Sequence, residues 1–297
     1  MNINFKKTIM KSILKIVSYL SLILIIISCE TDVTNDITLV TGPPKLVIQG
    51  GLERNIVRSL SVQKIKLTTT NNFLLDDPNP IIENAKVSIT DGTDTWVFSY
   101  QGDGVYSNSV IKPQIGNSYT ITIIWNGDTY VGIDRLKEVP KIENFYTVFE
   151  EETLFSSEGY YLRYDTTDPV GVKNYYYRRV FKNDEAVLLP DPGNSFNLIS
   201  SDEFFDGQTL KNINFNDEVN FKIGEKGTGQ QLGITKEYFD YLFELFTQTG
   251  SSGSAFSGNP PPATIRSNVI NTTEPSRRAL GFFYTVDVAE DSLIVTE

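Results

Sequence analysis

Residues 119–133 read YTITIIWNGDTYVGI. Apolar and polar side chains alternate on both sides of Asn126-Gly127, as they do in strands that bury one face and expose the other. Asn-Gly is a strong signal for a type I′ hairpin turn, because both central residues of that turn need a positive φ. The stretch therefore predicts an antiparallel hairpin and places the chain in a mainly β fold class.

The same alternation, interrupted by turn residues, extends over residues 45–139, where Asp91-Gly92 is a second hairpin signal. We predict strands at Lys45–Gln49, Val57–Thr68, Ala85–Thr90, Thr95–Tyr100, Tyr119–Trp125 and Thr129–Ile133. Short strands at regular spacing over about a hundred residues are typical of a β-sandwich. The strings at Asn84–Asp91, Gly104–Tyr106 and Tyr119–Ile123 are similar to transthyretin-like and immunoglobulin-like modules. Residues 45–139 are therefore expected to form an immunoglobulin/transthyretin-like β-sandwich domain.

Val139-Pro140 predicts a domain boundary, because proline cannot donate to a strand ladder, and aromatic residues become more frequent after it. Residues 140–297 are expected to form a second β-rich domain. Its predicted strands are Phe145–Phe149, Tyr160–Tyr164, Asn174–Phe181, Glu218–Ile223, Thr264–Ile270 and Leu280–Val288. The glycine-rich string Gly224–Gly229 does not match a phosphate-binding loop and is interpreted as a turn.

One α-helix is predicted at residues 235–249 of the second domain. Thr235 is a suitable N-cap, Ile234 can pack against Phe239 as a hydrophobic staple, and Gly250 suits the position after the helix. The apolar residues then recur at the three-four spacing of a single helix face. We expect this helix to cover the second sheet.

The N-terminus carries an export signal. Four lysines precede a short apolar run, and the run ends in Ile26-Ile27-Ser28-Cys29. This tetrad resembles a bacterial lipobox, which implies cleavage between Ser28 and Cys29 and acylation (palmitate or a similar chain) of Cys29; a signal peptide that ends in a chance cysteine is the alternative. Residues 1–28 are thus predicted to be a lipoprotein signal peptide, and residues 29–44 an acylated flexible tether.

Composition excludes several kinds of chemistry. Once the four leader lysines are removed, 22 basic and 37 acidic residues leave a net charge of −15, which argues against nucleic acid as a partner. The chain has no histidine and only one cysteine, so Ser-His-Asp and Cys-His catalysis and the usual zinc ligands are excluded. Carboxylate-pair glycosidase chemistry and oxygen-ligated calcium stay open. We expect neither an enzyme nor a cofactor.

Several short strings occur in a recognisable order along the second region. They are Ser201–Gly207, Thr235–Leu242, Phe256–Pro261, Asn268 and Ala279–Phe283. Together with Lys45–Ile48 they resemble an uncharacterised Bacteroidota lipoprotein family, domain of unknown function 4249. Members of that family are commonly encoded beside TonB-dependent transporters, so the resemblance implies a TonB-dependent outer-membrane transporter as the partner. It implies no catalytic residues.

Candidate binding residues fall into three groups. Tyr175 and Tyr177 lie on one face of a predicted strand, with Tyr176 on the other, and could stack on a sugar ring or fill a core. Asp202 and Asp206, with Glu203 between them, could supply oxygen ligands to calcium or be solvated acids in a turn. Asn259 lies in the proline-rich loop 251–263, which with loop 183–201 is a candidate contact surface.

These observations predict a non-catalytic accessory or binding subunit that is lipid-anchored in the outer membrane, in the cell-surface leaflet, and works with a TonB-dependent transporter in nutrient uptake. Two alternatives stay open: a stand-alone glycan-binding surface lipoprotein, and a structural subunit of an outer-membrane assembly complex. A histidine-free hydrolase that uses paired carboxylates is a third.

Overall fold

The computed structural model describes residues 42–55, 57, 62–71, 78–154, 156–187, 198–250 and 265–296. The predicted signal peptide, the cleavage site Ser28-Cys29, most of the tether, and Asn259 lie outside the described residues. Within the described residues, no helix has the length and apolar character needed to cross a membrane.

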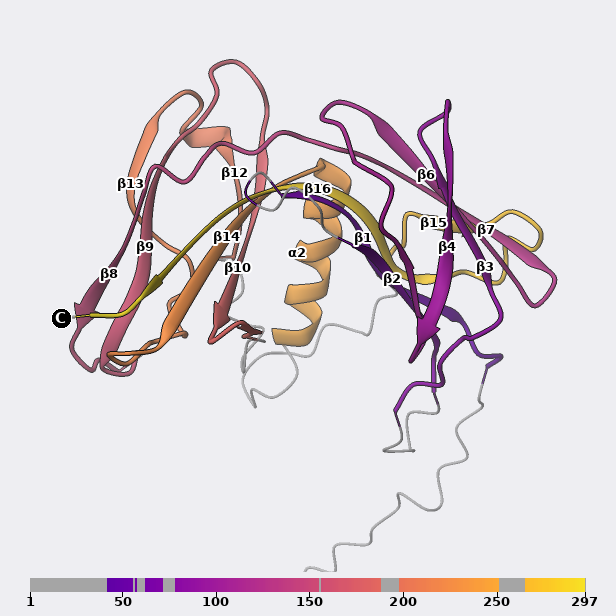
Figure 1. Ribbon diagram of the computed structural model, residues 1–297, viewed down its shortest axis with the longest axis horizontal. Helices are drawn as coiled ribbons and strands as arrows, with labels where there is room; N and C mark the ends of the chain where they lie inside the picture. The colour runs from indigo at the N-terminus through magenta and orange to yellow at the C-terminus, as the bar shows by residue number, and fades with distance from the viewer. Residues whose placement is uncertain are drawn as a thin grey trace, which may run out of the picture. The chain divides into compact units, whose positions relative to one another are not determined.

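The chain is mainly β, as predicted, with one α-helix among the described residues (Figure 1). The strands of the first half are β1 Leu46–Asn55, β2 Gln63–Thr69, β3 Lys86–Thr90, β4 Thr95–Gly102, β5 Val105–Asn108, β6 Ser118–Trp125 and β7 Asp128–Arg135. Those of the second half are β8 Asn144–Glu150, β9 Gly159–Thr167, β10 Tyr175–Lys182, β11 Glu185–Ala186, β12 Ile199–Ser201, β13 Thr209–Asn214, β14 Lys226–Ile234, β15 Val269–Asn271 and β16 Leu280–Ile294. A 3-10 turn covers Asp202–Phe204, and the helix α2 covers Lys236–Gly250.

Thirteen of the described strands form one sheet, and β13, β9 and β8 form a smaller one. The order along the large sheet is β11-β10-β14-β16-β1-β2-β5-β4-β3-β6-β7-β15, with β12 paired to β10. The last strand, β16, lies parallel to the first, with Val47 opposite Leu280 and Asn55 opposite Val288. Strands from both ends of the chain therefore lie side by side in one sheet. The predicted division at Val139-Pro140 stays a prediction.

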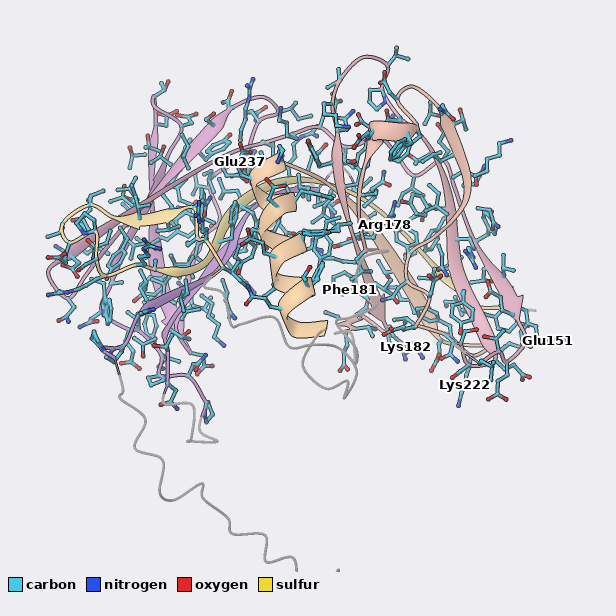
Figure 2. The ribbon with its side chains drawn as sticks, turned by 180° about the vertical axis from the view of Figure 1, so that it is seen from behind. Glu151, Arg178, Phe181, Lys182, Lys222 and Glu237 are labelled. Carbon is cyan, nitrogen blue, oxygen red and sulfur yellow. The ribbon has the colours of Figure 1, made fainter. Side chains whose placement is uncertain are left out.

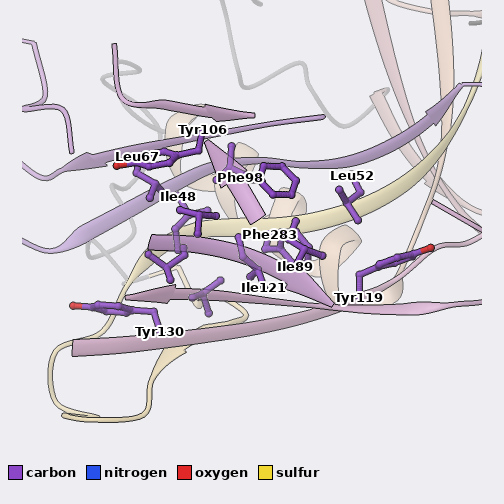
Figure 3. Close-up of a cluster of buried hydrophobic side chains, with 14 of the residues drawn as sticks. Ile48, Leu52, Leu67, Ile89, Phe98, Tyr106, Tyr119, Ile121, Tyr130 and Phe283 are labelled. Carbon is purple, nitrogen blue, oxygen red and sulfur yellow. The ribbon is translucent and has the colours of Figure 1, made fainter. Parts of the chain in front are cut away.

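The largest hydrophobic core lies mainly among the strands of the first half of the chain, with a contribution from β16. It collects buried side chains of β1, β2, β5 and β16, such as Ile48, Leu67 and Phe283, together with side chains of β3, β6 and β7, such as Ile89 and Ile121 (Figure 3). Strands β3, β6 and β7 alternate buried and more exposed positions, because successive side chains of a strand point to opposite faces. The alternate side chains of β3, β6 and β7 therefore point away from this core, toward the opposite face of the sheet.

The predicted helix and its start are confirmed. The Thr235 hydroxyl accepts a hydrogen bond from the backbone N–H of Tyr238 at 3.4 Å, which is the expected N-cap contact. Ile234 and Phe239 belong to the same apolar cluster as the buried residues of α2 and β16. The helix thus covers β10, β12 and β16, as predicted.

Three predictions in the second half are wrong. Among the described residues of the predicted strand Thr264–Ile270, only Val269 and Ile270 belong to a strand, β15. Glu218–Ile223 is not a strand, because only Phe221 forms an isolated bridge, with Tyr160. Gly224–Gly229 is not simply a turn, because its last four residues begin strand β14. Glycine is needed within this strand for close packing, because a Cβ at Gly229 would lie 2.6 Å from the buried ring of Phe215.

Candidate functional site

One surface stands out because several aliphatic side chains on it are exposed to solvent. A row of directly paired residues crosses the strands β15, β7, β6, β3 and β4 in turn. The row consists of Ile270, Val131, Thr122, Ser88 and Val97. Because each pair lies directly opposite in the ladder, all five side chains point to the same side of the sheet. We call this row and its cross-strand neighbours, which include Ile124 and Ile133, the outward face.

The outward face is exposed and nearly free of charge. Val97 is 67 % exposed, Ile270 62 %, Ile133 59 % and Ile124 45 %. Thr120 and Thr129 fill neighbouring positions, opposite Ile133 and Ile124. Lys86 and Arg135, at the ends of β3 and β7, are the charged side chains that share this orientation. Soluble surfaces seldom gather aliphatic side chains in this way unless another molecule covers them.

Tyr175 and Tyr177 lie on one face of β10 and Tyr176 on the other, as predicted. Both Tyr175 and Tyr177 are half-buried beneath α2. The ring of Tyr175 packs 5.1 Å from that of Phe239, and the ring of Tyr177 packs 6.3 Å from that of Phe246. Burial also raises the pKa of the Tyr177 hydroxyl. Their faces are therefore used by the helix, which favours the core interpretation over the sugar-binding one.

Asp202 and Asp206 do come together, and Asp168 joins them. One carboxylate oxygen from each lies within 4.8 Å of the others. Asp202 Oδ2 accepts from the backbone N–H of Asn174 at 2.6 Å, and Asp206 Oδ1 accepts from that of Gly171 at 2.7 Å. These three residues could together hold a divalent cation, since hard cations take carboxylate ligands at close spacing.

The protein already neutralises part of this carboxylate cluster. Lys173 Nζ lies 2.9 Å from Asp202 Oδ1, and the hydrogen bond to Asp202 raises the pKa of the Lys173 ammonium. Asp168 accepts hydrogen bonds from the Tyr176 hydroxyl and from the backbone N–H of Gly207. The cluster therefore joins the loop at 168–174 to the loop at 202–207, and a metal ion would have to displace the lysine.

A second polar cluster lies on the side of the sheet that α2 covers. Arg179 of β10 makes two hydrogen bonds to the Glu53 carboxylate of β1, at 2.8 and 3.1 Å. Burial alone would lower the pKa of Arg179, but the Glu53 carboxylate outweighs it and raises that pKa. The Tyr284 hydroxyl also donates to Glu53, at 3.1 Å, while Arg179 Nε donates to Gln230 at 2.9 Å. Four adjacent strands are thus linked through side chains that are far apart in the sequence.

The opposite side of β10 carries Arg178, labelled in Figure 2. Its Nε donates to the Tyr164 hydroxyl at 2.8 Å, and the Tyr164 hydroxyl donates to Gln231. Arg178 also donates to Ser200 at 3.0 Å. This buried network joins the small sheet to the large one, and each of its members has a hydrogen-bond partner, as buried polar groups require.

Asp134 is a buried acid with a shifted pKa. It is 7 % exposed and accepts hydrogen bonds from the Thr235 hydroxyl at 2.8 Å and from the backbone N–H of Thr285 at 2.6 Å. Burial is the largest influence and raises the pKa of Asp134 to about 6, although both hydrogen bonds oppose the shift. Asp134 therefore connects β7 to the start of α2 and to β16.

Sequence reasoning found Asp202 and Asp206 but missed Asp168, the Glu53 cluster and the outward face. A signal for the outward face was present. At the positions of β6 and β7 that alternate with the core residues stand threonine, valine and isoleucine, where an ordinary solvated face carries charges. Cys29, Ser28 and Asn259, and most of the candidate loops, lie outside the described residues.

The fold and the surface together define a β-rich protein with an aliphatic sheet face and one covering helix. Residues 30–292 match the model of the family described as domain of unknown function (DUF4249). The chain belongs to this family. A search of the curated proteins finds no match to the chain.

Proposed function

We propose that this protein is a non-catalytic, lipid-anchored subunit of the outer membrane that binds a TonB-dependent transporter through its outward face and assists nutrient uptake. The observation that carries the proposal is the outward face, on which Val97, Ile270, Ile133 and Ile124 are exposed. The charged residues of this face, Lys86 and Arg135, stand only at strand ends. A face of this kind suits a protein partner, because covering it removes apolar surface from water without stranding buried charges.

The lipobox at Ile26–Cys29 supports the membrane part of the proposal, because acyl chains on Cys29 would anchor the chain without a membrane-spanning helix. The choice of transporter rests on the family resemblance. A stand-alone glycan-binding protein is less well supported, because α2 covers Tyr175 and Tyr177.

Co-purification tests the partner. The lipoprotein is tagged in its native host, extracted in mild non-ionic detergent, and purified, and the barrel proteins that follow it are identified by mass spectrometry. Ile124→Lys/Ile133→Lys places two charges on the outward face and is expected to lower the barrel yield at least ten-fold. Val110→Lys is the matched control, since Val110 is 70 % exposed and lies outside this face.

Two results would overturn the proposal. One is that no transporter barrel follows the wild-type chain. The other is that Ile124→Lys/Ile133→Lys retains the barrel at the yield of Val110→Lys. Recovery of a different outer-membrane complex would favour the structural-subunit alternative.

The anchor is tested separately by Cys29→Ser. This variant is expected to lose acylation and to leave the outer-membrane fraction while its β-sheet content stays that of the wild type, as measured by fractionation and circular dichroism. Retention of the variant in the outer-membrane fraction would contradict the lipid anchor.

A further inference from the structure

A cavity of about 720 Å³ lies beside β15 and is lined by residues between Ile265 and Ala279. These residues belong to the yellow segment around β15 in Figure 1. Cavities between about 300 and 1,000 Å³ are the usual size for small organic ligands.

The walls of this cavity are held in place by contacts with the sheet. Asn268 Nδ2 donates to the carbonyls of Ile133 and Phe283, and its Oδ1 accepts from the N–H of Phe283 at 2.9 Å. The segment that follows β15 is attached to the sheet by Arg277, which forms an ion pair with Asp128 of β7 at 3.1 Å. A ligand would therefore enter a largely preformed site, which lowers the entropic cost of binding.

Much of the lining is apolar. Ile265, Val269, Ile270, Pro275 and Ala279 contribute to the wall. Val269 and Ala279 are at most 3 % exposed and belong to the main hydrophobic core. The cavity can thus accept an apolar body against a rigid surface.

Two arginines line the same cavity. Neither Arg266 nor Arg278 forms an ion pair with a carboxylate among the described residues, whereas their neighbour Arg277 does. Guanidinium groups without an internal partner are suited to binding a carboxylate or phosphate from outside.

Asn271 is a polar side chain that holds the wall in place. Its Oδ1 accepts from the backbone N–H groups of Thr273 and Glu274, at 3.0 and 2.8 Å, so the orientation of its amide is fixed. Its side chain also interacts with the Tyr130 hydroxyl of β7.

We propose that this cavity binds a small organic anion that combines one carboxylate with an apolar body. The carboxylate would interact with Arg266 and Arg278, and the apolar body would lie against Val269, Pro275 and Ala279. This site adjoins the proposed transporter contact, with which it shares Ile270, and it would give the protein a ligand of its own.

The test compares two ligands with the same body and different charge, 4-phenylbutyrate and the neutral 4-phenylbutanamide. Binding to the full chain in non-ionic detergent is measured by isothermal titration calorimetry, with detergent alone as the blank. The wild-type protein is expected to bind the carboxylate at least ten-fold more tightly than the amide.

Three variants assign that preference to the cavity. Arg266→Gln/Arg278→Gln is expected to reduce the affinity ratio to about one, whereas Arg135→Gln, an exposed arginine away from the cavity, should keep it. Pro275→Trp fills the cavity and should weaken both ligands, while circular dichroism and thermal melting check that each variant folds.

The proposal is overturned if the wild-type chain binds neither ligand or shows no preference for the carboxylate. It is also overturned if the preference survives in Arg266→Gln/Arg278→Gln. Failure here leaves the co-purification result unaffected, because that experiment depends on Ile124→Lys/Ile133→Lys and Val110→Lys, and none of these residues lines the cavity.

Discussion

Replacing Asp134 with asparagine is expected to remove one contribution to the pH dependence of folding stability. Burial raises the pKa of Asp134 from 3.8 to about 6. The unfolded chain therefore loses this proton at lower pH than the folded chain does. For an acid with a raised folded pKa, the stabilisation is complete below the unfolded pKa and is lost as the pH rises through the folded pKa.

The magnitude follows from the size of the shift. A shift of about two units corresponds to about 3 kcal/mol, so the wild-type free energy of unfolding should lose about that much from this group between pH 4 and pH 7. Asparagine cannot titrate, yet its amide can keep contacts with Thr235 and Thr285. The wild-type and variant stabilities should consequently diverge below pH 6 and run parallel above pH 7.

Urea unfolding at pH 4, 5, 6, 7 and 8 measures this difference for the wild type, Asp134→Asn and Asp94→Asn. Asp94 is an exposed acid at a turn, so its variant should follow the wild-type curve. If the difference between the wild type and Asp134→Asn stays constant from pH 4 to pH 8, Asp134 is ionised in the folded protein throughout, and the reasoning is refuted.

Two further substitutions test the packing and the carboxylate cluster. Gly229→Ala should lower the free energy of unfolding by about 1–3 kcal/mol, because its Cβ would lie 2.6 Å from the ring of Phe215. Gly42→Ala, where a Cβ meets no atom within 4 Å, is the matched control, and equal urea midpoints for the two variants would contradict the packing argument. Lys173→Met should cost about 1–3 kcal/mol, because it leaves the buried Asp202 carboxylate without its cation. An unchanged urea midpoint would show that the ion pair contributes nothing, and a midpoint that calcium raises only in Lys173→Met would show that the cluster can hold a metal.

The elements that could be predicted are those whose signal is local. Asn126 and Gly127 have φ values of 50° and 84°, as the Asn-Gly pair in a type I′ turn requires. The helix was predictable because Thr235 and the apolar spacing after it lie within four turns of one another. At Asp91-Gly92, by contrast, only Gly92 has a positive φ, and the turn extends to Asp94.

The elements that could not be predicted depend on partners that are distant in the sequence. Strand β14 contains three glycines, which by themselves favour a turn. Only the fold shows why they are there: Leu162 packs against Gly227, Phe215 against Gly229, and the backbone of Glu138 against Gly233. Asp168 precedes Asp202 by many residues, so nothing in its own surroundings predicted that they would meet.

The buried acids show how the ends of the chain are connected in a protein that can form no internal disulfide. Asp134 of β7 bonds to Thr235 and Thr285, while Asp287 of β16 bonds to Arg54 at 2.7 Å and to the N–H of Val139 at 3.1 Å. Burial raises the pKa of Asp287 as well. The residue just before the predicted boundary at Pro140 is thus held by β16, and the Leu280–Val288 part of that strand also pairs with β1. Because β16 supplies Phe283 to the core of the outward-face strands, that face depends on residues from both predicted domains.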